Sequence, residues 1–300
     1  MTGAILAERT LEFVTFEYAF AARALVASVL VGALCGLVGT FMVLRRMSLI
    51  GDAAGHATLP GVVGAFLVTG SKAMAPLLAG GLGTALLATW VVERVAGGRR
   101  TRPDAAIAVS LAVFFGLGLV LLSIAQRSPT AAQAGLNGIL FGNAAGVTTP
   151  QLVTLSVIAL TLAALVLALV RPLTVATFDP SFARAAGVPL HLVRAGVTLA
   201  LTLAVVVSIH AVGVVLVAAM LITPPSTALL VTRRMPSALA VSAGIGAASG
   251  AVGAWISFVV DGVSTGPAMV LVASAAFALA WVFAADSPVR LPRRAARVTS

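Results

Sequence analysis

The sequence predicts an all-α membrane protein, a polytopic helix bundle of about nine spans that forms one domain over residues 1–300. Hydrophobic residues make up 60% of the chain and charged residues only 9%, whereas a soluble domain is about 25% charged. The apolar residues gather in runs long enough to cross a bilayer, and most arginines lie between these runs. The net charge of +10 therefore indicates membrane topology rather than nucleic-acid binding.

The apolar runs define the spans in chain order. Residues 1–17 lack the basic start and apolar core of a signal peptide, so we expect an extracytoplasmic lead-in helix there. Residues 126–149 are too polar to cross simply, and we expect a re-entrant or surface segment. The sixth span is the shortest, and the count becomes eight if it does not cross. The nine spans are residues 18–44, 49–68, 73–96, 105–125, 151–170, 194–209, 212–231, 237–260 and 267–285.

The orientation follows from the positive-inside rule. If the basic tail, residues 286–300, lies in the cytoplasm, a count of nine spans places the other arginine-rich loops there too. The acidic N-terminus then lies outside. The loops on the cytoplasmic side are residues 45–46, 97–104, 171–193 and 233–234.

Asp52 and His56 are two polar residues inside the second span. Four residues apart on a helix, they share one face. A carboxylate and an imidazole together form half of a site for a divalent transition metal, and their cost at membrane depth favours a functional role. The alternative is that they pair with each other or with backbone to hold a helix broken at Gly51, Gly55 and Pro60.

Other features allow both a functional and a structural interpretation. His210, at the outer end of the sixth span, is either a second metal ligand or an interfacial histidine. Asp261, in an outer turn, either attracts cations or caps the turn. Pro224 and Pro225 remove two backbone donors, so the freed carbonyls either line a path or belong to a kink needed for packing. Glycines four apart, as at 32 and 36 or at 246 and 250, favour close helix packing.

A short helix is specified within the cytoplasmic loop 171–193 by its own capping residues. Asp179 is a good N-cap, Pro180 suits the first helical position, and Gly187 supplies the left-handed stop. Such a helix outside the membrane is either a handle for a soluble partner or a structured connection. The sequence holds no G-x-x-x-x-G-K-[ST] phosphate loop, so active transport needs an ion gradient or a partner ATPase.

The chain resembles the permease subunits of ABC importers for manganese, zinc and iron, the ABC-3 family. The most specific block is Arg45-Arg46-Met47-Ser48 with Gly51-Asp52 and residues 56–61. The resemblance covers nearly the whole chain and continues through residues 133–136, 140–142, 179–187, 211–213, 221–224, 261 and 266–267. The chain departs from the family pattern at His210, where a glutamine is expected, and at Pro225-Ser226, where two alanines are commoner.

The resemblance implies a permease of the type II ABC importer kind, a homodimer or a pair of paralogues, in a bacterial or archaeal cytoplasmic membrane. Asp52 and His56 would line the path near its outer gate, and two facing copies would supply four ligands. A binding protein outside would deliver the metal, and a cytoplasmic ATPase would use the ATP, so this chain would be no enzyme and hold no permanent cofactor. The ATPase would bind the loop helix at Asp179, Pro180, Phe182, Ala183, Arg184 and Gly187.

Two other functions remain as alternatives. An ion-coupled secondary metal transporter would use Asp52 as a proton carrier and work without an ATPase, although no inverted repeat of interrupted helices is evident. An intramembrane enzyme would need a nucleophile with its base or an H-E-x-x-H motif, and neither is present. Oxygen and nitrogen ligands suit manganese, zinc and iron alike. Residues 133–142 look more like the manganese and iron branch, which favours manganese.

Overall fold

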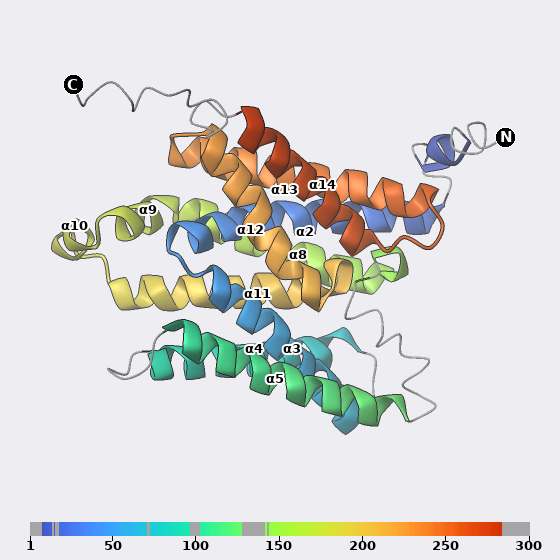
Figure 1. The fold of residues 1–300 in the computed structure, drawn as a ribbon, viewed down its shortest axis with the longest axis horizontal. Helices are drawn as coiled ribbons and strands as arrows, with labels where there is room; N and C mark the ends of the chain where they lie inside the picture. Colours follow the sequence, from blue (N-terminus) through green and yellow to red (C-terminus); the bar gives the residue numbers. More distant parts are fainter. Residues whose placement is uncertain are drawn as a thin grey trace, which may run out of the picture.

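The computed structural model describes residues 8–13, 15, 18–70, 73–96, 103–127, 142 and 144–283. Within these residues the chain forms helices and no strand, which confirms the all-α prediction (Figure 1). The elements are α2 (Ala19–Leu44), α3 (Ser48–Thr69), α4 (Met74–Ala96), α5 (Pro103–Gln126), η1 (Ala144–Gly146), α8 (Thr149–Ala168), α9 (Val170–Phe178), α10 (Pro180–Ala185), α11 (Leu190–Val212), α12 (Val214–Val231), α13 (Met235–Val259) and α14 (Thr265–Phe283).

Each of the nine predicted spans corresponds to one long helix of the described residues. Seven of these helices are long and apolar enough on their own to cross a membrane, while α3 is not among the seven and α12 has a shorter apolar stretch. Nine is therefore an approximate count. The sixth span begins at Leu190 rather than at residue 194, and its apolar stretch to Ile209 is long enough to cross.

The segment 171–193 is mostly helical, although the sequence analysis treats all but its short helix as a polar loop. Helix α9 follows α8 after a break at Leu169, and α10 and the first turn of α11 complete the segment. Pro172 lies in the first turn of α9, where its missing N–H costs nothing. Leu173 and Ala176 are buried, so burial of an apolar face stabilises α9 despite its polar neighbours.

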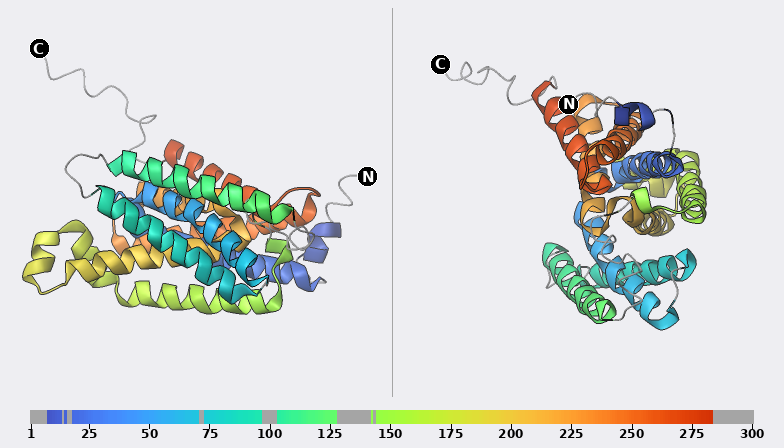
Figure 2. Two further views of the ribbon diagram at one scale, coloured as in Figure 1. Left: turned by 90° about the horizontal axis from the view of Figure 1, so that it is seen from below. Right: turned by 90° about the vertical axis from the view of Figure 1, so that its right-hand side faces the viewer.

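The helices form two groups, which Figure 2 shows separated in its right-hand view. Helices α3, α4 and α5 form one group, and α2, α8, α13 and α14 belong to the other, with α11 and α12 between them. Gly61 of α3 lies directly against Gly80 of α4, since a Cβ atom on either would overlap the carbonyl of the other. Close packing of this kind fixes α3 in place and thereby positions Asp52 and His56.

The glycines predicted to bring helices together do so between α2 and α13. A Cβ atom on Gly32 would overlap the carbonyl oxygen of Gly246, and the reverse is also true. One turn along, Gly36 lies against the backbone of Ser242, whose hydroxyl donates to the Gly36 carbonyl at 2.8 Å. The prediction of close packing at this spacing is confirmed.

Candidate metal site

The candidate metal ligands lie on an unbroken helix. Helix α3 continues from Ser48 to Thr69 through the glycines and through Pro60, so the pair does not hold a broken helix together. Nε2 of His56 lies 3.4 Å from Oδ1 of Asp52, which confirms that they share a face. That separation is longer than a well-formed hydrogen bond, so the two side chains are close without being locked to each other.

Helix α5 provides the wall behind His56. The imidazole packs edge-on against the ring of Phe115, with the ring centroids 4.6 Å apart. The His56 side chain is 13% exposed, that of Asp52 is 34% exposed, and Nδ1 of His56 is buried without a hydrogen-bond partner. A buried polar atom without a partner is costly, which favours a site that fills only when a ligand or water is present.

Pro60 removes one helical hydrogen bond from the helix that carries the pair. Because proline has no N–H, the carbonyl of His56, four residues earlier, does not receive the usual helical hydrogen bond from residue 60. The helix nevertheless continues to Thr69.

One copy of the chain supplies too few ligands to enclose an ion. Among the described residues, no group of three or more His, Cys, Asp and Glu side chains converges. A closed zinc site takes four protein ligands, and manganese takes more. The half-exposed Leu49 and the partly exposed Asp52 lie on the same face of α3, so this face is open to further ligands.

Asp52 and His56 lie in the first half of α3, which begins just after Arg45 and Arg46. In the predicted orientation these arginines mark the cytoplasmic side. The depth of the pair along a path, near the outer gate as the resemblance implies, stays a prediction.

Of the two weaker candidate ligands, Asp261 has a different partner from the pair. Asp261, in the turn between α13 and α14, forms an ion pair with Nη1 of Arg9 at 2.9 Å, and the same nitrogen donates to the Val259 carbonyl. This hydrogen bond and the charge of Arg9 hold the pKa of Asp261 below its ordinary value. The ion pair favours an anchoring role. His210 lies in the last turn of α11, and its side chain is outside the described residues.

The two prolines of α12 belong to helix packing. Helix α12 continues through Pro224 and Pro225, and Pro225 leaves the Leu221 carbonyl without its helical partner. That carbonyl lies directly against Gly39 of α2, where a Cβ atom would overlap it. Of the two interpretations left open by the sequence, this contact supports the packing one.

The predicted loop helix is present as α10, with the expected capping residues. Oδ1 of Asp179 accepts hydrogen bonds from the backbone N–H of Phe182 at 2.9 Å and of Ser181 at 3.1 Å, and Gly187 has a φ of 78°. The N–H of Phe182 and the Ser181 hydroxyl lower the pKa of Asp179. Ala183 is buried, whereas the side chains of Phe178 and Phe182 are exposed. Helix α10 lies at one end of the bundle (Figure 1).

The sequence analysis missed the contact between His56 and Phe115. Helix α5 is apolar almost throughout, so no feature of its sequence distinguishes the phenylalanine that faces α3 from the one beside it. The segments 133–141, 97–102 and 284–300, which the sequence analysis singles out in part or in whole, lie outside the described residues.

These features define a multi-pass, all-helical membrane protein with a pair of metal-ligand side chains inside one helix and a self-capped helix at one end. The chain belongs to the ABC 3 transport family, whose model matches residues 17–284.

Named relatives and a solved structure support this assignment. The chain is 36% identical over 260 residues to "Manganese transport system membrane protein MntC" of Bacillus subtilis, covering 87% of this chain and 60% of that protein. It is 40% identical over 237 residues to "Zinc transport system membrane protein TroC" of Treponema pallidum, covering 79% and 80%. The structure titled "PsaBC from Streptococcus pneumoniae in complex with Fab" matches with a TM-score of 0.82 and 30% identity, covering 92% of this chain and 97% of that one.

Proposed function

We propose that this chain is the permease subunit of an ATP-driven importer for divalent transition-metal ions, in which the metal passes Asp52 and His56 where two permease subunits meet. The observation that carries the proposal is the pair itself, two metal-ligand side chains 3.4 Å apart inside an apolar helix. The membrane is the cytoplasmic membrane of a bacterium or archaeon. The metal is cargo, so no permanent cofactor is required.

The geometry of the pair favours a shared site. A two-fold axis beside α3 brings two carboxylates and two imidazoles together, which makes four ligands from two identical incomplete sets. A transport site must also release its ion, and a site formed only when two subunits approach is suited to weak, transient binding.

Helix α10 favours ATP as the energy source. Its caps keep it folded outside the membrane, and the exposed rings of Phe178 and Phe182 offer an apolar anchor to a soluble partner. Arg184 lies on the same short helix, next to Ala183, which is buried against the chain itself. We assign the ATPase contact to Asp179, Pro180, Phe182, Arg184 and Gly187, while the buried Ala183 packs α10 against the chain itself.

The metal proposed first is manganese, with zinc and iron as the alternatives. One relative is named for manganese transport and another for zinc transport, and the ligand types suit both. An extracytoplasmic binding protein would add a further selection step before the ion reaches α3.

The test of the function is uptake by proteoliposomes that contain this chain, its ATPase and its binding protein. We expect manganese to accumulate with ATP and not with a non-hydrolysable analogue. A proton gradient of either sign, without ATP, serves as the control for the secondary transporter. Accumulation driven by the gradient alone, by the chain without the ATPase, would overturn the proposal.

A further inference from the structure

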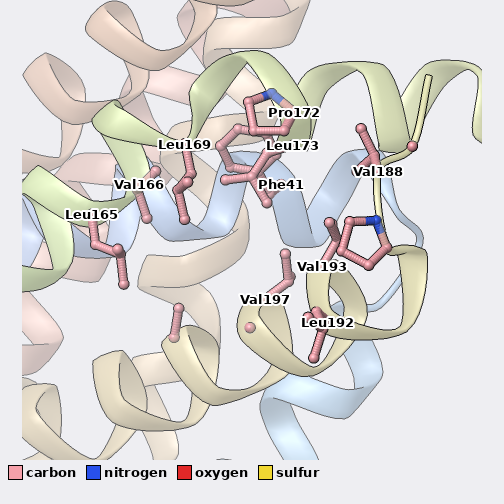
Figure 3. Close-up of a pocket in the computed structure, with 14 residues that line it drawn as sticks. Phe41, Leu165, Val166, Leu169, Pro172, Leu173, Val188, Leu192, Val193 and Val197 are labelled. Atoms are coloured by element: carbon pink, nitrogen blue, oxygen red, sulfur yellow. The ribbon is translucent and has the colours of Figure 1, made fainter. Parts of the chain in front are cut away.

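An apolar groove of about 420 Å³ lies between α8–α9 and α11, with Phe41 of α2 at its base (Figure 3). This volume is within the range of about 300–1,000 Å³ that is typical of ligand sites. Side chains of α8 and α9 face those of α11 across it. Its lining is aliphatic or aromatic apart from backbone atoms, with Leu165, Leu169 and Leu173 on one side and Leu192, Gly196 and Val197 on the other.

A positively charged side chain lies beyond one end of the groove. Arg45 lies one turn beyond Phe41, and Thr177 one turn beyond Leu173, and Nε of Arg45 donates to the Thr177 hydroxyl at 3.1 Å. Burial lowers the pKa of Arg45, and the charge of Arg194 lowers it further. Among the described residues, Arg45 forms no ion pair with a carboxylate. The charge of Arg45 is therefore not neutralised by an acid among these residues.

The groove also opens to the outside of the bundle. Leu165 is 50% exposed, Leu169 44% and Leu192 60%, although all three line the groove. They belong to the ends of α8–α9 and α11 that lead into α10. In the predicted orientation this is the cytoplasmic end of the spans, where α8 and α11 meet the membrane surface. An apolar groove at that surface with an arginine beyond its end is complementary to an acyl chain that carries an anionic headgroup.

We propose that this groove binds one acyl chain of an anionic phospholipid from the cytoplasmic leaflet, with the phosphate held at Arg45. The lipid contacts both α8–α9 and α11, the segments that directly precede and follow α10 in the chain. Its occupancy fixes the position of α10 relative to the bundle, so anionic lipid supports the transfer of motion from an ATPase to the spans.

The test uses the purified full-length chain and counts retained lipid by native mass spectrometry. Phosphatidylglycerol is compared with phosphatidylcholine of the same acyl chains. The variant Gly196→Leu fills the groove, and the change is compatible with the fold because a Cβ atom at Gly196 has no neighbour within 4 Å. Gly244→Leu in α13 is the matched control, since Gly244 is equally open and lies outside the groove.

A second pair of variants tests the charge. Arg45→Gln removes the proposed phosphate ligand, and Arg234→Gln removes an exposed arginine at the start of α13 that makes no capping hydrogen bond. We expect Arg45→Gln to weaken retention of phosphatidylglycerol about five-fold and to leave phosphatidylcholine unchanged. The Arg234→Gln variant retains both lipids as the wild type does.

The outcomes separate the lipid from other occupants. The proposal predicts that the wild type prefers phosphatidylglycerol and that Gly196→Leu loses this preference while Gly244→Leu keeps it. Equal retention of the two lipids by the wild type would overturn it. It would also be overturned if Gly196→Leu retained phosphatidylglycerol normally but lost self-association or ATPase binding, because the groove would then receive a protein segment.

Discussion

At the scale of single residues, the imidazole of His56 has a specific and costly environment. One of its nitrogens faces a carboxylate 3.4 Å away, and the other is buried without a partner. In a core selected only for packing, an apolar residue beside Phe115 would avoid both costs. The arrangement therefore supports binding rather than stability as the reason for a histidine at this position.

The ion pair between Arg9 and Asp261 leads to a prediction about the N-terminal helix. Because Arg9 lowers the pKa of Asp261 from 3.8, the contribution of the ion pair is present above pH 3.8 and is lost as the pH falls below the lowered pKa. We expect Asp261→Asn to speed hydrogen exchange at residues 8–13 near neutral pH. At a pH below the lowered pKa the variant and the wild type should exchange alike.

The control for that measurement is Asp104→Asn, which removes an exposed acid in the first turn of α5. Unchanged exchange at residues 8–13 in Asp261→Asn would show that the ion pair does not anchor the N-terminal helix. Asp261 would then again be a candidate for attracting cations.

At the scale of elements, backbone contact between α2 and α13 holds the larger helix group together. Lipid gives helices little hydrophobic reason to associate, so close van der Waals contact and hydrogen bonds such as that from Ser242 to Gly36 become important. The glycines permit this approach because their missing Cβ atoms would occupy the space of the opposite carbonyls.

Substitution of one of these glycines should separate the two helices. We expect Gly246→Ala to lower the stability by about 1–3 kcal/mol, because its Cβ atom would overlap the backbone of Gly32 and the helices must shift. The measurement is thermal unfolding in detergent. Gly244→Ala, with no neighbour within 4 Å, should be neutral or slightly stabilising. Equal effects of the two variants would contradict the close contact.

The N-cap of α10 allows a test of its proposed docking role. We expect Asp179→Ala to weaken ATPase binding, because two backbone N–H groups lose their acceptor and α10 frays. Asp179→Asn should restore binding, since asparagine is an equally good cap without the charge. Binding of the ATPase by each variant is measured by pull-down. If Asp179→Asn binds as weakly as Asp179→Ala, the effect comes from the lost charge rather than from lost helix capping.

The elements that the sequence predicts well are those determined by composition or by local rules. The spans follow from apolar runs, the spacing of Asp52 and His56 places them on one face, and the cap of α10 follows from Asp179 and Pro180. The sequence predicts a polar loop where α9 lies, because the buried face that stabilises this helix depends on tertiary packing. The partners of His56 and Asp261 come from elements far apart in sequence, and no local pattern indicates them.

At the scale of the whole molecule, the candidate site is incomplete in one copy of the chain. The described residues bring only two metal-ligand side chains together, on a face of α3 that remains partly exposed. A symmetric dimer would complete the ligand set and would cover that face in the same step. The location of the site and the need for a second subunit are thus parts of one hypothesis.

Cross-linking tests the arrangement of the two subunits. We expect Leu49→Cys, on the same exposed face of α3 as Asp52, to give covalent dimers with a short bismaleimide in membranes. The native Cys35 is buried and should remain unreactive. Leu271→Cys, exposed on α14, is the comparison and should stay monomeric. Dimers from Leu271→Cys alone would place the interface on the other side of the molecule.

The most direct test of the central claim is metal uptake by Asp52→Ala and His56→Ala in the fully assembled transporter. Thr58→Ala is the matched control. The Thr58 hydroxyl donates a hydrogen bond to the Ala54 carbonyl within α3, and Thr58 lies on a different face of the helix from Asp52 and His56. We predict that both variants lose ATP-driven manganese uptake while ATPase assembly and the Thr58→Ala control remain normal. Normal uptake by both variants, with the complex intact, would contradict passage of the metal past this pair.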